Sequence, residues 1–385
     1  CCSRLGWAFT FFPDDTRTTS LSTNVRIFLL TDIPSPYQVE VLNEIAQDKD
    51  LEVHVGYLRQ VDPGRKWGTS AIEHESIMLD GDPAALAIAD ELVTKAELVV
   101  FNNYRHPHAE HLIAKRAKSQ RPWCFWGERP GLRKPEWVGR MVRSWKLRWL
   151  HSSAAPIWGV GEFALKRYKD EFGSTRAYFN FPYFSNLKRF SDQSSTNGQQ
   201  LGGTRTFLFS GSLITRKGID LVARAFVRLL NEGHDVRLKI VGDGDLRSIV
   251  EATLDNSKKH VDFVGFVGWD NLPAQYATGQ VMCVPSRYDG WGLVVPEGLA
   301  AGLPVIATDR MGAAVEFVVT GKNGWLISAD DEEAILTAMR DAATLSSKRF
   351  TELANNARES VREHSLEHGA SRFKLYANQA LANWH

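Results

Sequence analysis

The chain has 385 residues, of which 43% are hydrophobic and 24% charged, and its net charge is +1 at pH 7. This length allows two domains that each bury a core, and the composition is typical of a soluble globular protein. The nearly balanced charge argues against a general nucleic-acid binder, and the sequence has no apolar run of about eighteen residues that would predict a membrane-spanning helix.

The N-terminal segment and the cysteines carry little chemistry. Residues 1–24 have no regular hydrophobic period and no apolar core of a secretory signal, so we expect a disordered leader there. The four cysteines lack metal-ligand spacing, and Cys124 and Cys283 lie inside apolar runs. Buried thiols without a disulfide framework are typical of a reducing compartment, which predicts a cytoplasmic protein.

Short apolar runs alternate with helical patterns through the first half of the chain. The expected strands are 25–30, 51–57, 98–101, 123–126, 157–160 and 178–182, and the first expected helix is 37–47. This alternation predicts a parallel sheet covered on both faces. The polar segment 191–203 is the expected linker, which gives an N-terminal domain of residues 25–190.

The alternation of strands and helices resumes after the expected linker. The expected strands include 206–209, 236–241 and 261–264, with helices at 218–231 and 246–254, and the chain is mostly helical from residue 334. This second domain is expected to span residues 204–365. Two doubly wound α/β domains bind their ligand at the carboxyl ends of the strands, in the cleft between them.

The segment 281–309 has the most informative pattern: an apolar run, a glycine-containing loop, a helix and a second apolar run. Gly290 and Gly292 allow a ligand to approach the backbone, and the amides at the helix start carry partial positive charge. Asp289 and Glu297 flank this loop, and ionised carboxylates only accept hydrogen bonds. Donors and acceptors together suit a ligand that has both phosphates and sugar hydroxyls.

A second pattern joins a strand to a helix through the basic turn 211–218. Arg216 and Lys217 would add full charges to the amides of a helix start, which suits a diphosphate. The alternative is an ordinary solvated turn. Further along, Gly242 lies in a glycine turn at the end of the strand 236–241.

The spacing from Asp289 to Glu297 resembles the Glu-x7-Glu signature of the retaining glycosyltransferases of family four, with Asp in the first position. Lys217-Gly218 resembles the family's diphosphate-binding turn, in which Ser212 replaces the usual Arg. Gly242 resembles part of its V-G-x-G element. The resemblance implies the GT-B fold, which has two Rossmann-like domains facing a central cleft. It also implies that a C-terminal helix, residues 366–385, crosses back to the N-terminal domain.

The resemblance also implies how a nucleotide-diphosphate sugar is bound. Glu297 would hold the ribose hydroxyls, while Asp289 and the amides around Gly292 hold the donor sugar and diphosphate. The full expected donor-binding set is Gly211, Arg216, Lys217, Gly242, Asp289, Gly290, Trp291, Gly292, Leu293 and Glu297. The nucleotide-sugar is a substrate, and no separate cofactor is expected. Retention in this family is explained by attack on the face from which the leaving group departs.

The expected catalytic set is Glu128, Asp289 and Lys217. Glu128 occupies the place where family members commonly have a His, so it would take the acceptor hydroxyl's proton or hold a donor hydroxyl. The alternative is a structural pair with Arg129. Polar residues in loops that follow strands, namely Tyr37, His106 and His108, are the acceptor-side candidates.

The helix expected over 135–150 has an apolar, Trp-rich face and several basic residues. We expect this face, which includes Trp137, Met141 and Trp145, to pack into the core of the first domain. The alternative is contact with an anionic membrane surface, which fits a lipid-linked acceptor as opposed to a glycan. Two D-x-D patterns, at 80–82 and 243–245, are weak metal signals, since Asp82-Pro83 is typical of a helix start. No metal is expected.

The predicted function is therefore transfer of a sugar from a nucleotide-diphosphate sugar to a hydroxyl group of a glycan or a lipid-linked acceptor. Two alternatives fit the same residues. One is a catalytically silent sensor that binds nucleotide-sugars through the second domain. The other is a different GT-B enzyme, such as a sugar-nucleotide epimerase or a phosphorylase.

Overall fold

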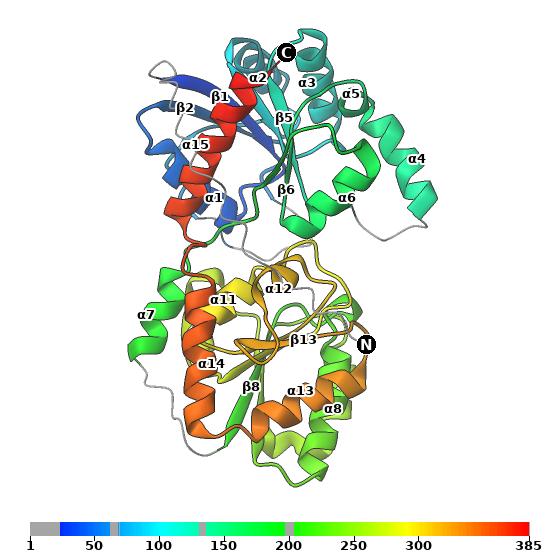
Figure 1. The fold of residues 1–385 in the computed structure, drawn as a ribbon, viewed down its shortest axis with the longest axis vertical. Helices are drawn as coiled ribbons and strands as arrows, with labels where there is room; N and C mark the ends of the chain where they lie inside the picture. The colour runs from blue at the N-terminus through cyan, green and yellow to red at the C-terminus, as the bar shows by residue number, and fades with distance from the viewer. Residues whose placement is uncertain (1–23, 62–67, 69, 131–135, 197–203, 385) are drawn as a thin grey trace.

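The computed structural model describes residues 24–61, 68, 70–130, 136–196 and 204–384. These residues form two lobes, each built on a parallel β-sheet with helices on both faces (Figure 1). The predicted leader, apart from Asn24, and residues 197–203 of the predicted linker lie outside the described residues.

The N-terminal lobe contains a sheet whose described strands have the order β3-β2-β1-β4-β5-β6-β7, all parallel. The strands are β1 (Val25–Thr31), β2 (Leu51–Tyr57), β3 (Glu75–Met78), β4 (Leu98–Phe101), β5 (Trp123–Gly127), β6 (Ile157–Gly159) and β7 (Tyr178–Asn180). The helices are α1 (Pro36–Ala46), α2 (Pro83–Lys95), α3 (Pro107–Lys118), α4 (Glu136–Lys146), α5 (Arg148–His151) and α6 (Glu162–Phe172). The central strands are buried on both faces, which explains their nearly continuous apolar runs.

The C-terminal lobe contains a second parallel sheet, in which the described strands have the order β10-β9-β8-β11-β12-β13. Its strands are β8 (Arg205–Ser210), β9 (Val236–Val241), β10 (Val261–Gly265), β11 (Val281–Val284), β12 (Val305–Thr308) and β13 (Gly324–Ile327). The helices are α7 (Lys188–Thr196), α8 (Ile219–Asn231), α9 (Arg247–Thr253), α10 (Leu272–Tyr276), α11 (Val294–Ala300), α12 (Gly312–Phe317), α13 (Glu332–Ala343) and α14 (Ser347–Ser360). Short 3-10 helices are η1 (Thr215–Lys217), η2 (Asp255–His260) and η3 (Trp269–Asn271).

The strand order reverses between β1 and β4 in the first sheet and between β8 and β11 in the second. Ligands of doubly wound sheets bind at such reversal points, beyond the carboxyl ends of the strands. The loops that follow β5 and β11 meet between the lobes, because the Glu128 carboxylate lies against Gly290. The two reversal points therefore belong to the same interdomain region.

The chain crosses between the lobes twice. It first crosses ahead of α7, which packs on α10 and α11 of the C-terminal lobe. It crosses back between α14 and α15 (Leu366–Ala382), and α15 packs along α1 of the N-terminal lobe (Figure 1). Phe373 of α15 makes an edge-on contact with Trp158 of β6, at 5.4 Å between ring centroids.

Two expectations about individual segments were wrong. Residues 191–196 of the predicted linker form the second half of α7, because Phe190 is fully buried against Tyr276 and anchors the helix. The apolar face of α4 is not in the core. Trp137, Met141 and Trp145 are 69%, 60% and 61% exposed, because Arg143 takes the inward position and pairs with Glu171 of α6.

Within the described part of the chain, none of the helices combines the length and the apolar content needed to cross a lipid bilayer.

Candidate functional site

The basic turn after β8 is held against the loop that follows β11. Gly218 has φ +74° and its Cα lies so close to the Pro285 carbonyl oxygen that a Cβ atom would overlap it. Only glycine tolerates both the left-handed backbone and this close approach. The amide of Arg287 also donates to the Arg216 carbonyl at 2.8 Å. The two segments that sequence reasoning assigned separately to the donor therefore form one unit.

Lys217, Arg216 and Asp289 converge at the centre of this unit. The Lys217 ammonium donates to Asp289 Oδ2, and Arg216 Nη1 lies 3.3 Å from the same oxygen. Burial opposes ionisation of Asp289, but the two cations prevail and hold the pKa of its carboxyl below the usual value. Two cations therefore share one carboxylate, which leaves the cluster with a net positive charge.

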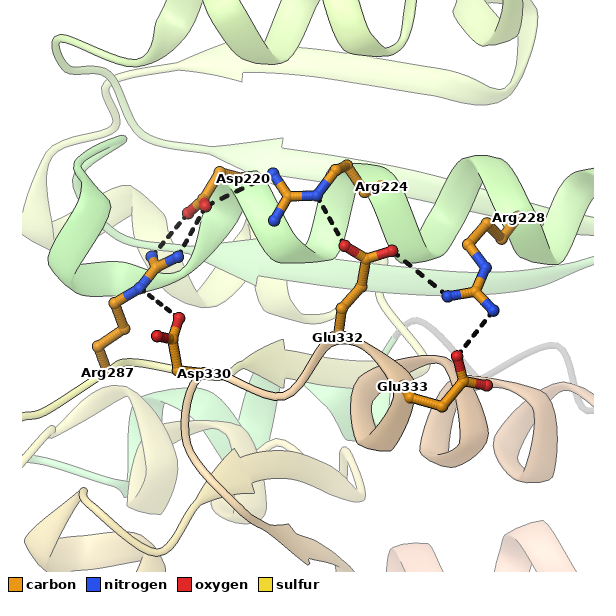
Figure 2. Close-up of polar contacts among 7 residues, drawn as sticks. All are labelled: Asp220, Arg224, Arg228, Arg287, Asp330, Glu332 and Glu333. Carbon is orange, nitrogen blue, oxygen red and sulfur yellow. Dashed lines mark hydrogen bonds and ion pairs between the residues drawn. The ribbon is translucent and has the colours of Figure 1, made fainter.

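Arg287 lies at one end of a network of ion pairs that continues along α8 (Figure 2). Its guanidinium makes two hydrogen bonds of 2.8 Å to the Asp220 carboxylate in the first turn of α8, and it also reaches Asp330. The same group donates to the Thr215 carbonyl within η1. Bidentate Arg–carboxylate pairs fix geometry as well as adding energy. Arg287 therefore fixes the turn that carries Lys217 relative to the loop that carries Asp289.

The network continues along α8 away from the cluster. Arg224 and Arg228 pair with Glu332 and Glu333 at the start of α13, at 2.7 Å for Arg224 Nε to Glu332 and for Arg228 Nη2 to Glu333 (Figure 2). These side chains are partly or largely exposed, so solvent screens the pairs and each stabilises the fold only weakly. Their effect is to join α8, which follows the basic turn, to α13.

Glu297 is the most unusual carboxylate in the C-terminal lobe. It lies in the first turn of α11, is 3% exposed, and its Oε1 has no hydrogen-bond partner among the described residues. Its Oε2 accepts from the Tyr276 hydroxyl at 3.3 Å, and that hydroxyl also contacts Ser210 Oγ at 3.1 Å. Burial raises the pKa of Glu297 to about 7. An orphaned buried oxygen of this kind suits a ligand hydroxyl that donates to it.

Glu297→Gln should make the protein more stable at pH 8 and change it little at pH 4. The folded-state pKa lies above the ordinary value of 4.5, so stability from the protonated form is present below 4.5 and is lost as pH rises through 7. A shift of this size corresponds to about 3 kcal/mol at pH 8. Urea unfolding midpoints at both pH values measure it. Glu359→Gln, which alters an exposed carboxylate of α14, should leave both midpoints close to wild type, and an equal effect of the two variants would contradict the prediction.

The other predicted donor-binding residues either offer backbone groups to the site or pack their side chains in the protein interior. Gly292 and Leu293 stand immediately before α11, so their amides face the loop end of that helix. Gly211 ends β8 and donates to the Val241 carbonyl at 2.9 Å, next to Gly242. Trp291 is 2% exposed, and its ring packs edge-on to Phe317 and over Gly161 of the opposite lobe. Its side chain therefore joins the lobes, and only its backbone is available to a ligand.

Glu128 faces this loop from the other lobe. It follows β5, its side chain is exposed, and its Oε2 lies against Gly290, leaving no room for a Cβ there. The Glu128 carbonyl accepts from the Tyr168 hydroxyl at 2.7 Å, which fixes its backbone. Arg129 is the residue that the alternative interpretation paired with Glu128. Its guanidinium stacks on the Phe163 ring at 3.8 Å, and its Nε has no partner in the described residues.

A buried polar network leads from Glu128 into the N-terminal lobe. The buried Tyr183 hydroxyl has the side chains of Glu128 and Asn102 as polar neighbours, and its ring lies 5.0 Å from Tyr37. Asn102 in turn donates to the Trp126 carbonyl at 2.9 Å and contacts Gln38 at 3.3 Å. The Tyr183 side chain therefore lies between those of Tyr37 and Glu128. Sequence reasoning missed Tyr183, whose only signal was its position directly after the last strand of the lobe.

His106 and His108 lie at a different point of the same sheet edge. His106 caps α3, where its Nδ1 accepts from the His108 amide at 3.2 Å. Burial, followed by His108, lowers the pKa of His106, and Asp32 and Arg59 are its other charged neighbours. These contacts give His106 a structural role as a cap and do not bring either histidine to Glu128.

Arg189 and its partners link the lobes beside Glu297. Glu40 of α1 lies 3.3 Å from Arg189 Nη1 and accepts from Trp269 Nε1 at 3.1 Å. The Arg189 guanidinium also stacks on the Trp269 ring at 4.2 Å, while its Nε and Nη2 find no partner in the described part of the chain. Sequence reasoning missed this contact, because it joins three segments that are far apart along the chain.

In each of the two D-x-D patterns, an aspartate side chain accepts a hydrogen bond from a backbone amide. Asp82 accepts from the Ala84 amide at 2.9 Å and caps α2, as expected, and Asp243 accepts from the Gly244 amide at 2.9 Å. In the residues that the structure describes, no group of three or more His, Cys, Asp or Glu side chains has an arrangement that could hold a metal ion.

Part of the chain is similar to known glycosyltransferases. Residues 204–344 match the family model described as "Glycosyl transferases group 1". A GDP-mannose-dependent alpha-(1-6)-phosphatidylinositol monomannoside mannosyltransferase of Mycolicibacterium smegmatis is 28% identical over 219 residues, covering 53% of this chain and 57% of that protein. An uncharacterized glycosyltransferase of Methanocaldococcus jannaschii is 33% identical over 162 residues, covering 41% and 40%. The chain thus spans about half the length of the curated relatives it matches.

Solved structures share the whole architecture at low sequence identity. A sucrose-phosphate synthase from Thermosynechococcus elongatus superposes with a TM-score of 0.70 at 20% identity, covering 93% of this chain and 99% of that one. The Anabaena protein HepE, in complex with UDP and glucose, gives a TM-score of 0.70 at 16% identity, covering 92% and 99%. These likenesses establish the fold, which is GT-B with two Rossmann-like domains.

Proposed function

We propose, from the premise that this chain belongs to the group 1 glycosyltransferases through residues 204–344, that it transfers a sugar from a nucleotide-diphosphate sugar to a hydroxyl acceptor. One observation carries the proposal. At the carboxyl edge of the second sheet, two cations share one carboxylate, and the helix that follows presents a buried carboxylate with an unpaired oxygen. Surplus positive charge suits a diphosphate, and an unpaired acceptor suits a sugar hydroxyl.

The donor would occupy both parts of this site. Lys217 and Arg216 would hold the diphosphate together with the amides of Gly292 and Leu293. Glu297 would accept hydrogen bonds from the ribose hydroxyls through the oxygen that has no partner in the described residues. The relatives whose printed names specify a donor use GDP-mannose, and a solved neighbour binds UDP, which supports a nucleotide-sugar but does not select the base.

Charge develops on the departing diphosphate in the transition state, and the basic turn is where that charge would be stabilised. Lys217 and Arg216 are fixed in advance by Asp289 and by the Arg287–Asp220 pair, so little reorganisation is needed during the reaction. Glu128 faces the same loop from the other lobe and would accept the proton of the attacking hydroxyl. Attack on the face from which the diphosphate leaves would retain the anomeric configuration.

The acceptor side is formed by the N-terminal lobe. Tyr183 lies next to Glu128, Tyr37 and Asn102 lie next to Tyr183, and these side chains supply groups that could orient a hydroxyl. The relatives from Mycolicibacterium smegmatis and Corynebacterium glutamicum are named for glycosylated phosphatidylinositol acceptors. By that similarity, a lipid-linked acceptor is the stronger proposal and a free glycan the weaker one.

A panel of nucleotide-sugars tests the donor proposal by thermal stabilisation of the purified chain. We expect one or more UDP-, GDP- or ADP-sugars to raise the unfolding temperature, with about 2.7 kcal/mol of stabilisation at a hundredfold excess over Kd. The matching nucleoside monophosphate should stabilise less, since it lacks the second phosphate that Lys217 would bind. The proposal fails if no member of the panel raises the unfolding temperature. Stabilisation without any release of nucleoside diphosphate would favour the sensor.

A further inference from the structure

Helix α4 exposes a row of large apolar side chains. Trp137, Met141 and Trp145 follow one another at intervals of four residues, so they lie along one side of the helix. They are 69%, 60% and 61% exposed, and Val142 beside them is 44% exposed. These are among the largest exposed hydrophobic residues in the described chain, and they are gathered on one short helix at the outer edge of the N-terminal lobe (Figure 1).

The opposite side of α4 is what attaches it to the lobe. Arg143 is nearly buried and its Nη2 lies 2.7 Å from Glu171 of α6, while Leu147, just after the helix, is 4% exposed. Burial lowers the pKa of Arg143, but Glu171 outweighs it, so the net shift is upward and the guanidinium stays charged. A firm ionic anchor therefore fixes the helix with its apolar row facing outward.

The surroundings of the row are basic. No Asp or Glu occurs from Trp137 to Gly161, whereas four Arg or Lys residues do. Lys146 lies 4.7 Å above the Trp145 ring, and Arg148 lies 5.5 Å from the Trp149 ring. Both cations share the single carboxylate of Glu110, at 3.2 Å and 3.0 Å, so one positive charge is left over in that group. Arg140 is exposed, with no ion pair in the described residues.

We propose that this surface, Trp137, Arg140, Met141, Val142 and Trp145, docks on an anionic phospholipid bilayer. Trp is favoured at the boundary between headgroups and acyl chains, where its ring is apolar and its N–H remains wet. Anionic headgroups complement the excess of Arg and Lys, and a helix with these two features lies in the plane of the interface. After Glu136, its first residue, α4 carries Arg140, Arg143 and Lys146 and no further carboxylate, so its charge favours an anionic bilayer over a basic protein surface.

The position of α4 relates the proposed bilayer surface to the cleft between the lobes. Residues 129–135 are all that separate Glu128 from the start of α4, so the helix is directly connected to the acceptor side. A bilayer under α4 would therefore lie beside the N-terminal lobe's half of the cleft. The docking itself goes beyond the proposed function and does not depend on turnover.

Sedimentation with vesicles tests the docking. Wild-type protein should pellet with phosphatidylcholine vesicles that contain 30% phosphatidylglycerol and remain in the supernatant with phosphatidylcholine alone. Trp137→Ser combined with Trp145→Ser should weaken the apparent vesicle affinity about tenfold or more, and Arg140→Glu should weaken it about tenfold. Binding of the wild type should also fall as salt is raised.

A matched control alters equally exposed apolar residues elsewhere. Ile249→Ser combined with Leu375→Ser changes side chains that are 56% and 51% exposed on α9 and α15, and should pellet like the wild type. Nucleotide-sugar stabilisation of all variants should equal that of the wild type, which separates this proposal from the donor proposal. Wild-type protein that stays in the supernatant with both vesicles, or a tryptophan variant that pellets as well as the control, overturns the docking.

Discussion

Glu128→Gln should lower kcat for release of the nucleoside diphosphate about 100-fold or more. The carboxylate lies against Gly290 of the loop that follows β11, and the Tyr183 hydroxyl is its neighbour in the N-terminal lobe. Gln preserves the shape and can still be held by Tyr183, but it cannot take a proton, and general base catalysis contributes about 10²–10⁴-fold. Release is measured with the donor that stabilises the protein in the nucleotide-sugar panel.

The expected pattern is a loss of rate with binding retained. Donor-induced thermal stabilisation of Glu128→Gln should match that of the wild type, since Glu128 is not part of the diphosphate or ribose site. Glu52→Gln is a suitable control, because that carboxylate is 42% exposed on β2 and lies at the end of the sheet away from the cleft. A variant at position 128 with wild-type kcat would remove Glu128 from the reaction.

Lys217→Met should lower kcat about 10²–10³-fold and reduce the donor-induced stabilisation. The ammonium is one of two cations on Asp289, and a preorganised charge at a departing group has an effect of this size. The same change leaves the largely buried Asp289 with Arg216 alone, so the variant should also lose stability. Activity and unfolding temperature are therefore measured together.

A double variant separates the two effects. Lys217→Met with Asp289→Asn removes the unpaired charge and should recover most of the lost stability while remaining inactive. Lys348→Met, at an exposed position of α14, should change neither quantity. If the double variant regained activity along with stability, Lys217 would be a structural residue, and the diphosphate site would have to lie elsewhere.

The sequence predicted the C-terminal lobe well because its signals are local. The strands expected at 206–209, 236–241 and 261–264 agree with β8, β9 and β10 to within one residue at each end. Lys217, Gly218, Asp289 and Glu297 all lie on segments whose conformation follows from a strand, a glycine turn and a helix start. Such features depend on residues that are close in sequence, so they can be predicted without knowing which other segments pack against them.

The residues on the N-terminal side of the site were harder to predict from the sequence. Glu128 was identified as a candidate, but its neighbours Tyr183 and Asn102 come from other strands, and only the parallel order of β4, β5 and β7 brings them together. His106 has a structural contact that the sequence did not indicate, and its place on the acceptor side stays a prediction. Its loop position suggested chemistry, whereas its Nδ1 caps α3. The role of α4 depended on which face the anchor at Arg143 turned inward, and helical periodicity does not contain that information.

What the sequence by itself determined is the doubly wound α/β class and the glycine turns and charged residues of the loops proposed to bind a donor, since short-range patterns of apolar residues, glycines and charges encode both. Only the tertiary structure decided which groups share a partner: two cations on Asp289, the Glu128 carboxylate against Gly290, and an orphaned oxygen on Glu297. The physical reason is that charge balance and burial are properties of groups brought together in space, and segments as distant in sequence as those of Glu128 and Gly290 meet only when both lobes have folded.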